Sequence, residues 1–129
     1  MLPPAALAIR RGLAFAVATH GVLQKQSARH KCPVSLLHTL LALHTVNEGT
    51  PYALPVSTGE LQRVMQLRLP LLRAYIRELT SRGYVKRERF YRRGALLLNL
   101  TADGRSVAGE CQRDLKHAAA GILESRGLK

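Results

Sequence analysis

The sequence predicts a mainly helical α+β domain with five helices and one β-hairpin. Three observations carry this prediction. Residues that start and stop helices divide the chain at intervals, apolar residues recur between them with helical spacing, and two short apolar segments follow the fourth helix closely enough to pair. The chain has 129 residues, 47% of them hydrophobic, which suffices for the core of a single domain spanning 1–129.

The first two helices form the amino-terminal part of the prediction. The first starts at Pro3–Pro4 and runs to about Arg29. It is rich in alanine and apolar on more than one side, so we expect it to pack on another subunit as well as on its own core. Pro33 can open the second helix, and Gly49 with Pro51 ends it. A broad leucine face predicts that this second helix is central and buried.

The third helix has the clearest start signal. After a short extended segment over 52–56, the run from Ser57 to Glu60 fits a capping box, with Ser57 as N-cap and Glu60 at the third helical position. Val56 and Leu61 have the spacing of a hydrophobic staple. The helix is expected to end near Gln66, with Leu61, Val64 and Met65 facing the core.

The fourth helix is predicted over 70–82. Leu72, Ile76 and Leu79 repeat at i, i+4 and i+7 and should face the core. Gly83 follows as the glycine that closes a helix. The opposite side is expected to carry Pro70, Arg73, Ala74, Arg77 and Ser81.

A hairpin and a last helix complete the chain. Tyr84–Glu88 and Ala95–Leu100 read as strands, with Arg89–Gly94 as the tip between them. Thr101 then caps a helix that runs to about Ser125.

Charge points to the class of partner. The chain carries 20 Lys and Arg against 8 Asp and Glu, a net charge of +12, which favours a polyanion. The stretch from Ser57 to Gly94 holds ten basic and three acidic residues. A basic helix beside a basic hairpin makes DNA binding the leading hypothesis, and a merely solvated surface is the alternative.

Other chemistries find little support in the sequence. There is no nucleophile–base pair, no paired carboxylates and no glycine-rich phosphate loop, so we expect neither an enzyme nor a cofactor. Cys32 lies near His30 and His38, but their spacing matches no zinc pattern, so no metal is expected. Cys32 and Cys111 are interpreted as free thiols. A redox role for Cys32 requires a lowered pKa and exposure.

Location is predicted from the amino-terminal segment. Its most apolar run, Gly12–Ala18, is far shorter than the roughly 20 residues that a bilayer requires. Arg10 and Arg11 precede this run and could mimic a twin-arginine export signal, but no small-residue cleavage site follows. We therefore expect a mature cytoplasmic protein without membrane association.

The order of elements resembles a winged helix-turn-helix, and more specifically the multiple-antibiotic-resistance-regulator (MarR) family. The residues that carry the resemblance are Glu60-Leu61, the run Leu79–Val85 and the run Leu98–Arg105. The last two are similar to that family's "L-x-x-x-G-L-V" and "L-T-x-x-G" landmarks. The match covers Val34 to about Leu115. One departure is Tyr91-Arg92-Arg93, where the family's wing often has Asp-Arg-Arg. The carboxyl-terminal helix is also short for the family.

The resemblance implies a homodimer bound to a pseudo-palindromic operator, most simply as a repressor. Segments 1–30 and 105–129 would dimerise, and 33–104 would form the DNA-binding winged helix with a two-stranded wing. Helix 70–82 would enter the major groove and wing 84–100 the minor groove. The DNA-binding residues would be Arg68, Pro70, Leu71, Arg73, Ala74, Arg77, Arg87, Arg89, Arg92 and Arg93.

These residues have different expected roles. Arg73 and Arg77 are assigned to base reading, because arginine pairs bidentately with guanine. Arg68 and Leu71 suit phosphate or thymine-methyl contact, and Arg87 is expected to neutralise the base of the wing. Arg89, Arg92 and Arg93 would follow phosphates or a narrow minor groove.

Two further possibilities stay open. The basic face can instead dock an acidic protein partner, which predicts little salt-dependent binding to duplex DNA. The resemblance also implies a possible small aromatic effector, with His20, His44 and Tyr75 as candidate lining residues. Ordinary packing is the simpler interpretation of these three side chains.

Overall fold

The structure, a computed structural model, describes residues 3–48, 55–89 and 96–125. Its elements follow the predicted order and confirm the mainly helical α+β fold. They are α1 (Pro4–His30), α2 (Val34–Glu48), β1 (Val56–Ser57), α3 (Thr58–Met65), α4 (Leu69–Ser81), β2 (Val85–Arg89), β3 (Leu96–Leu100) and α5 (Ala102–Ser125).

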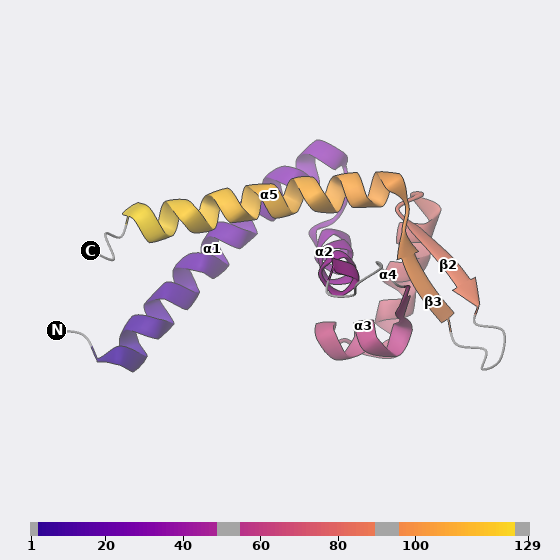
Figure 1. The fold of residues 1–129 in the computed structure, drawn as a ribbon, viewed down its shortest axis with the longest axis horizontal. Helices are drawn as coiled ribbons and strands as arrows, with labels where there is room; N and C mark the ends of the chain where they lie inside the picture. Colours follow the sequence, from indigo (N-terminus) through magenta and orange to yellow (C-terminus); the bar gives the residue numbers. More distant parts are fainter. Residues whose placement is uncertain (1–2, 49–54, 90–95, 126–129) are drawn as a thin grey trace.

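The molecule has a compact part and two projecting helices. In Figure 1, α2, α3, α4 and the sheet gather at one end, while α1 and α5 run out from it toward both chain termini. Polar side chains join these two helices near the compact part. Glu110 accepts from Arg29 Nη1 at 2.6 Å and contacts His30 Nε2 at 2.7 Å, and Gln26 Nε2 donates to Asp114 at 2.6 Å.

The core forms around α2, as its broad leucine face predicts. Leu36, Leu37, Leu40 and Leu43 are all buried. The neighbouring elements pack their apolar side chains against these leucines. The contributing residues include Leu23, Val56, Leu61, Leu72, Ile76, Leu79, Val85, Leu98, Leu100 and Val107.

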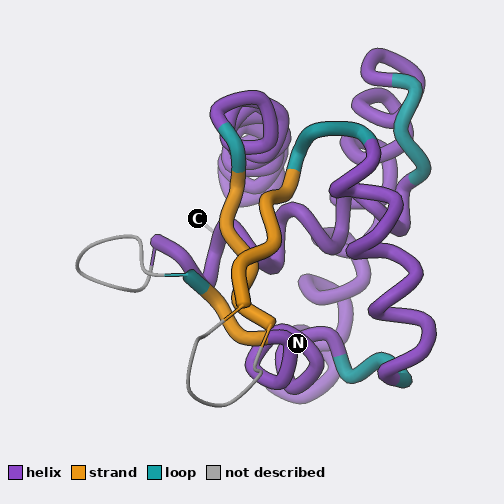
Figure 2. Tube along the Cα trace, turned by 90° about the vertical axis from the view of Figure 1, so that its right-hand side faces the viewer, coloured by secondary structure: helices purple, strands orange, loops and turns teal. Residues whose placement is uncertain are grey.

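The sheet has three strands in the order β1-β3-β2, all antiparallel. The sequence predicts only a short extended segment before α3, but Val56 pairs with Leu98 and so adds a third strand beside the wing. Figure 2 shows the strands side by side, next to the helices. Arg89 pairs with Leu96 inside the ladder, so the prediction that it belongs to the tip is wrong. The rest of the tip, 90–95, lies outside the described residues.

The outer part of α1 leaves an apolar face uncovered. Ile9, Leu13 and Val17 are 64%, 61% and 73% exposed. α1 has 27 residues, and an 18-residue stretch of it is apolar enough to cross a membrane by length and composition alone, which the short run Gly12–Ala18 did not suggest. An exposed apolar face of this size indicates a surface that something else covers.

Candidate nucleic-acid interface

The helix α4 presents two arginines on a rigid support. Leu72, Ile76 and Leu79 are buried, which fixes the rotation of the helix about its axis. Arg73 and Arg77, one turn apart, are therefore exposed on the opposite side, as the helical spacing predicts. Pro70 lies in the first turn, where its missing N–H costs no hydrogen bond.

The shorter helix α3 supports α4 through the turn between them. Ser57 Oγ accepts from the backbone N–H of Glu60 at 3.1 Å, which confirms the predicted N-cap. Gln66 ends α3 in the left-handed region at φ 53°, and Gln62 donates to the Leu67 carbonyl at 3.3 Å. Val64 is 56% exposed, so its predicted inward position is wrong. This short helix reaches the core along the edge that carries Leu61 and Met65 only.

The carboxyl end of α4 meets the start of α5, and this junction joins the two runs Leu79–Val85 and Leu98–Arg105. Gly83 has φ 79°, and its N–H and that of Tyr84 donate back to Thr80 and Leu79 in a Schellman pattern. The Thr101 hydroxyl donates to the Gly83 carbonyl at 2.5 Å and accepts from the Gly104 N–H at 3.1 Å. The end of α4 and the cap of α5 are thus one hydrogen-bonded unit.

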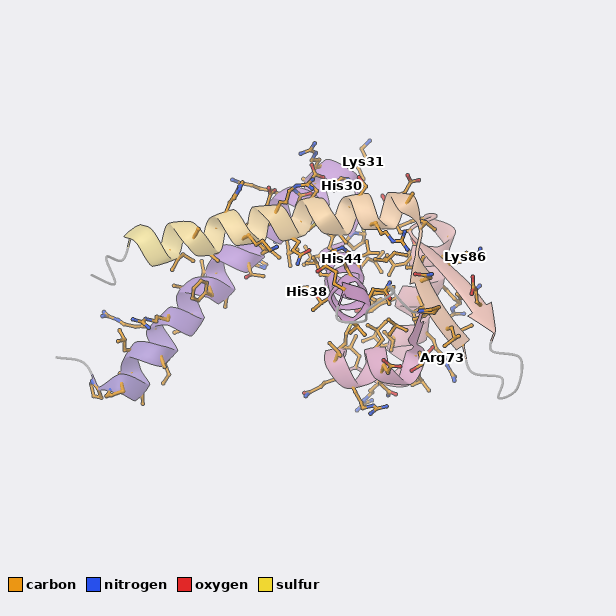
Figure 3. All side chains as sticks on the ribbon, viewed as in Figure 1. His30, Lys31, His38, His44, Arg73 and Lys86 are labelled. Carbon is orange, nitrogen blue, oxygen red and sulfur yellow. The ribbon has the colours of Figure 1, made fainter. Side chains whose placement is uncertain are left out.

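A hollow of about 380 Å³ lies between α4 and the wing. It is lined by Pro70, Arg73, Arg77, Arg87 and Leu96. The register explains how the wing contributes: residues directly opposite each other share a sheet face, so Arg87 and Leu96 continue the face that carries Leu98. The lining of the hollow therefore combines two apolar residues, Pro70 and Leu96, with three arginines. Figure 3 shows Arg73 beside the sheet, toward the tip end of the strands, and Lys86 nearer the base of the wing.

The three arginines of the hollow carry uncompensated charge. Arg73, Arg77 and Arg87 make no ion pair or hydrogen bond with any residue in the described ranges, and no acidic residue lines the hollow. By contrast, Glu78 contacts Arg82 Nε at 3.3 Å and Glu88 contacts Lys86 Nζ at 3.7 Å. Glu78 and Glu88, the acidic residues nearest in sequence to these arginines, thus contact other cations. The positive charge of the hollow therefore favours an anion as its ligand.

The structure brings together part of the predicted set. Arg73, Arg77, Arg87 and Pro70 meet at the hollow, whereas Arg68 and Leu71 are exposed at the start of α4 outside its lining, and Ala74 is half-buried. Arg89 lies in β2, and Arg92 and Arg93 lie outside the described residues. Sequence reasoning missed Leu96, because only strand register brings it against α4. Arg87, which the sequence assigned to the base of the wing, lies in the lining of the hollow.

Neither cysteine has the surroundings that a redox sensor requires. Cys32 is 1% exposed and Cys111 is 0% exposed, and both are free thiols. Burial raises the pKa of the Cys32 thiol despite the nearby Arg82 guanidinium, which lowers it. In the part of the chain that the structure describes, no group of three or more His, Cys, Asp and Glu could hold a metal ion.

Cys111 makes stability depend on alkaline pH. Burial first, then Glu110, Asp114 and the Cys32 thiol, raise its pKa from 9.0 to about 11. The unfolded thiol ionises at the lower pH, so its contribution is full below pH 9 and is lost as pH rises toward 11. We expect a loss of about 2–3 kcal/mol over this window. Urea titrations of wild type and Cys111→Ala should differ there, and parallel pH profiles would contradict the assignment.

The three candidate effector residues lie on different helices. His20 is exposed on α1, where Gln24 hydrogen-bonds its ring at 3.2 Å. Tyr75 packs against the core from α4. His44 is half-buried on α2 and contacts Glu48 at 3.5 Å through Nε2, while its buried Nδ1 has no hydrogen-bond partner among the described residues. Figure 3 shows His44 beneath α5.

The geometry defines a winged helix-turn-helix with two long helices appended. The chain matches no protein-family profile and no curated protein sequence. Among solved structures it is similar to a mutant MarR from E. coli complexed with operator DNA (TM-score 0.66, 16% identity, 87% of this chain and 76% of that one). It is also similar to a mutant MepR from a multidrug resistant S. aureus clinical isolate (0.75, 11%, 97% and 85%) and to NadR in complex with 4-hydroxyphenylacetate (0.69, 16%, 98% and 83%). At these identities the likeness establishes the MarR-type fold.

Proposed function

We propose that this protein is a DNA-binding transcriptional regulator, most simply a repressor, that binds a pseudo-palindromic operator as a homodimer. The observation that carries the proposal is the hollow between α4 and the wing, where three arginines without partners among the described residues face solvent. A net charge of +12 adds long-range attraction to DNA. The operator complex of the mutant MarR, which shares the fold, supports DNA as the polyanion.

The proposed division of labour follows the two parts of the fold. Segments 1–30 and 105–129 dimerise through α1 and α5, and 33–104 binds DNA. In this arrangement α4 enters the major groove and Arg73 and Arg77 read bases, while Arg87 holds the backbone at the edge of the hollow. The wing arginines Arg89, Arg92 and Arg93 follow phosphates. Such a regulator acts in the cytoplasm and needs no catalytic group.

A small aromatic effector belongs to the same proposal. The NadR structure with 4-hydroxyphenylacetate supports this ligand class for the fold. In this chain the buried Nδ1 of His44 offers a polar atom between α2 and the helices around it. His20 and Tyr75 are the other candidate contacts.

The test compares a base-reading arginine with a wing arginine. Arg73→Ala should cost about 1–3 kcal/mol of binding and relax discrimination at one base step. Arg92→Ala should weaken all duplexes alike and flatten the salt dependence, whose logarithmic slope we expect near −5 to −9 for about six to ten phosphates. Fluorescence anisotropy with duplexes selected from a random pool measures both effects.

The same titrations can refute the proposal. If the two variants behave identically across operator variants, the assignment of roles is wrong. If wild type binds duplex DNA without salt dependence, or does not bind it, the basic face serves an acidic protein partner instead.

A further inference from the structure

The side chain of Arg82 connects the end of α4 with the end of α1. Arg82 is the C-cap of α4, and its Nη1 donates to the Lys31 carbonyl at 2.8 Å. Lys31 is the C-cap of α1 and has left-handed backbone at φ 50°. Within the described ranges this is the one hydrogen bond between the recognition-helix segment 69–82 and the α1 segment 4–31.

The chemistry suits a fixed joint. Carbonyls at a helix end lack intrahelical partners and carry partial negative charge, so a guanidinium binds them well. Glu78 holds the same guanidinium through Nε at 3.3 Å, and the side chain is 28% exposed. The planar group therefore spans two partners that lie on different parts of the fold.

We infer that Arg82 is a positioning residue that fixes the angle between the recognition helix α4 and the dimerisation helix α1, while Thr101 holds the same end of α4 to α5. Arg82 thereby sets the separation of half-sites that the dimer accepts. This inference rests on the proposed function. It concerns a residue at the far end of α4, about 20 Å from the first turn, because thirteen residues rise by about 1.5 Å each.

That length turns a small rotation into a change of register. A tilt of about 10° at Arg82 displaces the first turn of α4 by about 3 Å, close to the rise of one base pair. The amino-terminal residues of a recognition helix contact base edges, and half-sites are spaced by helical turns of DNA. A loose joint should therefore relax the spacing requirement without changing contacts within a half-site.

The first experiment measures the angle without DNA. A nitroxide at Leu71→Cys, which is 42% exposed in the first turn of α4, reports the distance between the two recognition helices of the full-length dimer. Both native cysteines are buried. We expect one narrow distance distribution in the otherwise wild-type protein and one about twice as broad with Arg82→Ala. Widths are compared under conditions where urea titration shows both proteins folded.

The matched control is Arg105→Ala. Arg105 is exposed near the start of α5 and makes no side-chain hydrogen bond or ion pair in the described part of the chain. Its replacement removes one positive charge without touching the joint, so the distribution should keep its wild-type width. Equal widths for Arg82→Ala and Arg105→Ala, or a monomeric wild-type protein, would overturn the inference.

The second experiment uses duplexes selected by wild type from a random pool, with one base pair inserted between half-sites. The inserted base pair should lower the affinity of wild type about tenfold or more and that of Arg82→Ala by a smaller factor. Arg82→Ala should bind a single half-site with the affinity of wild type. If Arg82→Ala weakens binding by the same factor on the selected duplex, on the duplex with the inserted base pair and on the single half-site, the inference is overturned. If the distances are narrow in wild type and Arg105→Ala and broad in Arg82→Ala, but wild type has no affinity for DNA, the proposed function is refuted and the joint is established.

Discussion

Replacing Gly104 with alanine will destabilise the protein by about 3 kcal/mol or more, through steric overlap with backbone. A Cβ at this position would lie 2.0 Å from the Tyr84 carbonyl oxygen and 2.9 Å from its carbon. Neither atom can move freely, because the same carbonyl accepts from the Thr101 N–H at 3.1 Å. Relief requires α5 to shift away from the end of α4. We therefore expect DNA affinity to fall as well.

Urea titration and thermal unfolding measure this effect, and Gly109→Ala is its control. Gly109 lies on the same helix, and an added Cβ there meets nothing within 4 Å. Alanine at position 109 should stabilise the helix by up to about 1 kcal/mol. Similar free energies of unfolding for the two variants would show that the close approach at Tyr84 does not constrain α5.

The second large effect concerns assembly. Introducing aspartate at Leu13 and Val17 together should convert the proposed dimer to a monomer, because it places two charges on the exposed apolar face of α1. Operator affinity should fall steeply, since each protomer then binds a half-site alone. Light scattering measures the mass, and anisotropy measures the affinity.

Val64→Asp is the control for this result. Val64 is also a strongly exposed apolar residue, but it lies on α3 in the compact part. Its charge should leave the dimer mass unchanged. If the double variant Leu13→Asp with Val17→Asp is still a dimer, the exposed face of α1 is not the dimer interface, and another surface of the protein forms it.

The start or end of a helix was predictable from the sequence where a single residue causes it through a local interaction or backbone conformation. Ser57 starts α3 because its side chain satisfies a free N–H, and Gly83 ends α4 because it adopts positive φ. Both signals act within four residues. Leu72, Ile76 and Leu79 were predictable for a similar reason, since helical spacing alone puts them on one side.

Features that depend on distant neighbours were not predictable. Val64 has helical spacing from Leu61, but α3 contacts the core along one edge only. The third strand depends on the pairing of Val56 with Leu98, which lies about forty positions away in the sequence. Likewise, the hollow depends on the register between β2 and β3, so its arginines were predictable from the sequence but the apolar lining residue Leu96 was not.

The junction at Gly83 and Thr101 also has a consequence for how this protein can change. The hydroxyl of Thr101 and the carbonyl of Gly83 close the base of the wing, where the chain leaves α4 and returns to α5. Both helices are thus held in place by bonds that lie outside the hairpin. We expect the wing to tolerate insertions and substitutions between 90 and 95 without altering either helix. New DNA contacts could then be acquired there while the frame of the molecule stays the same.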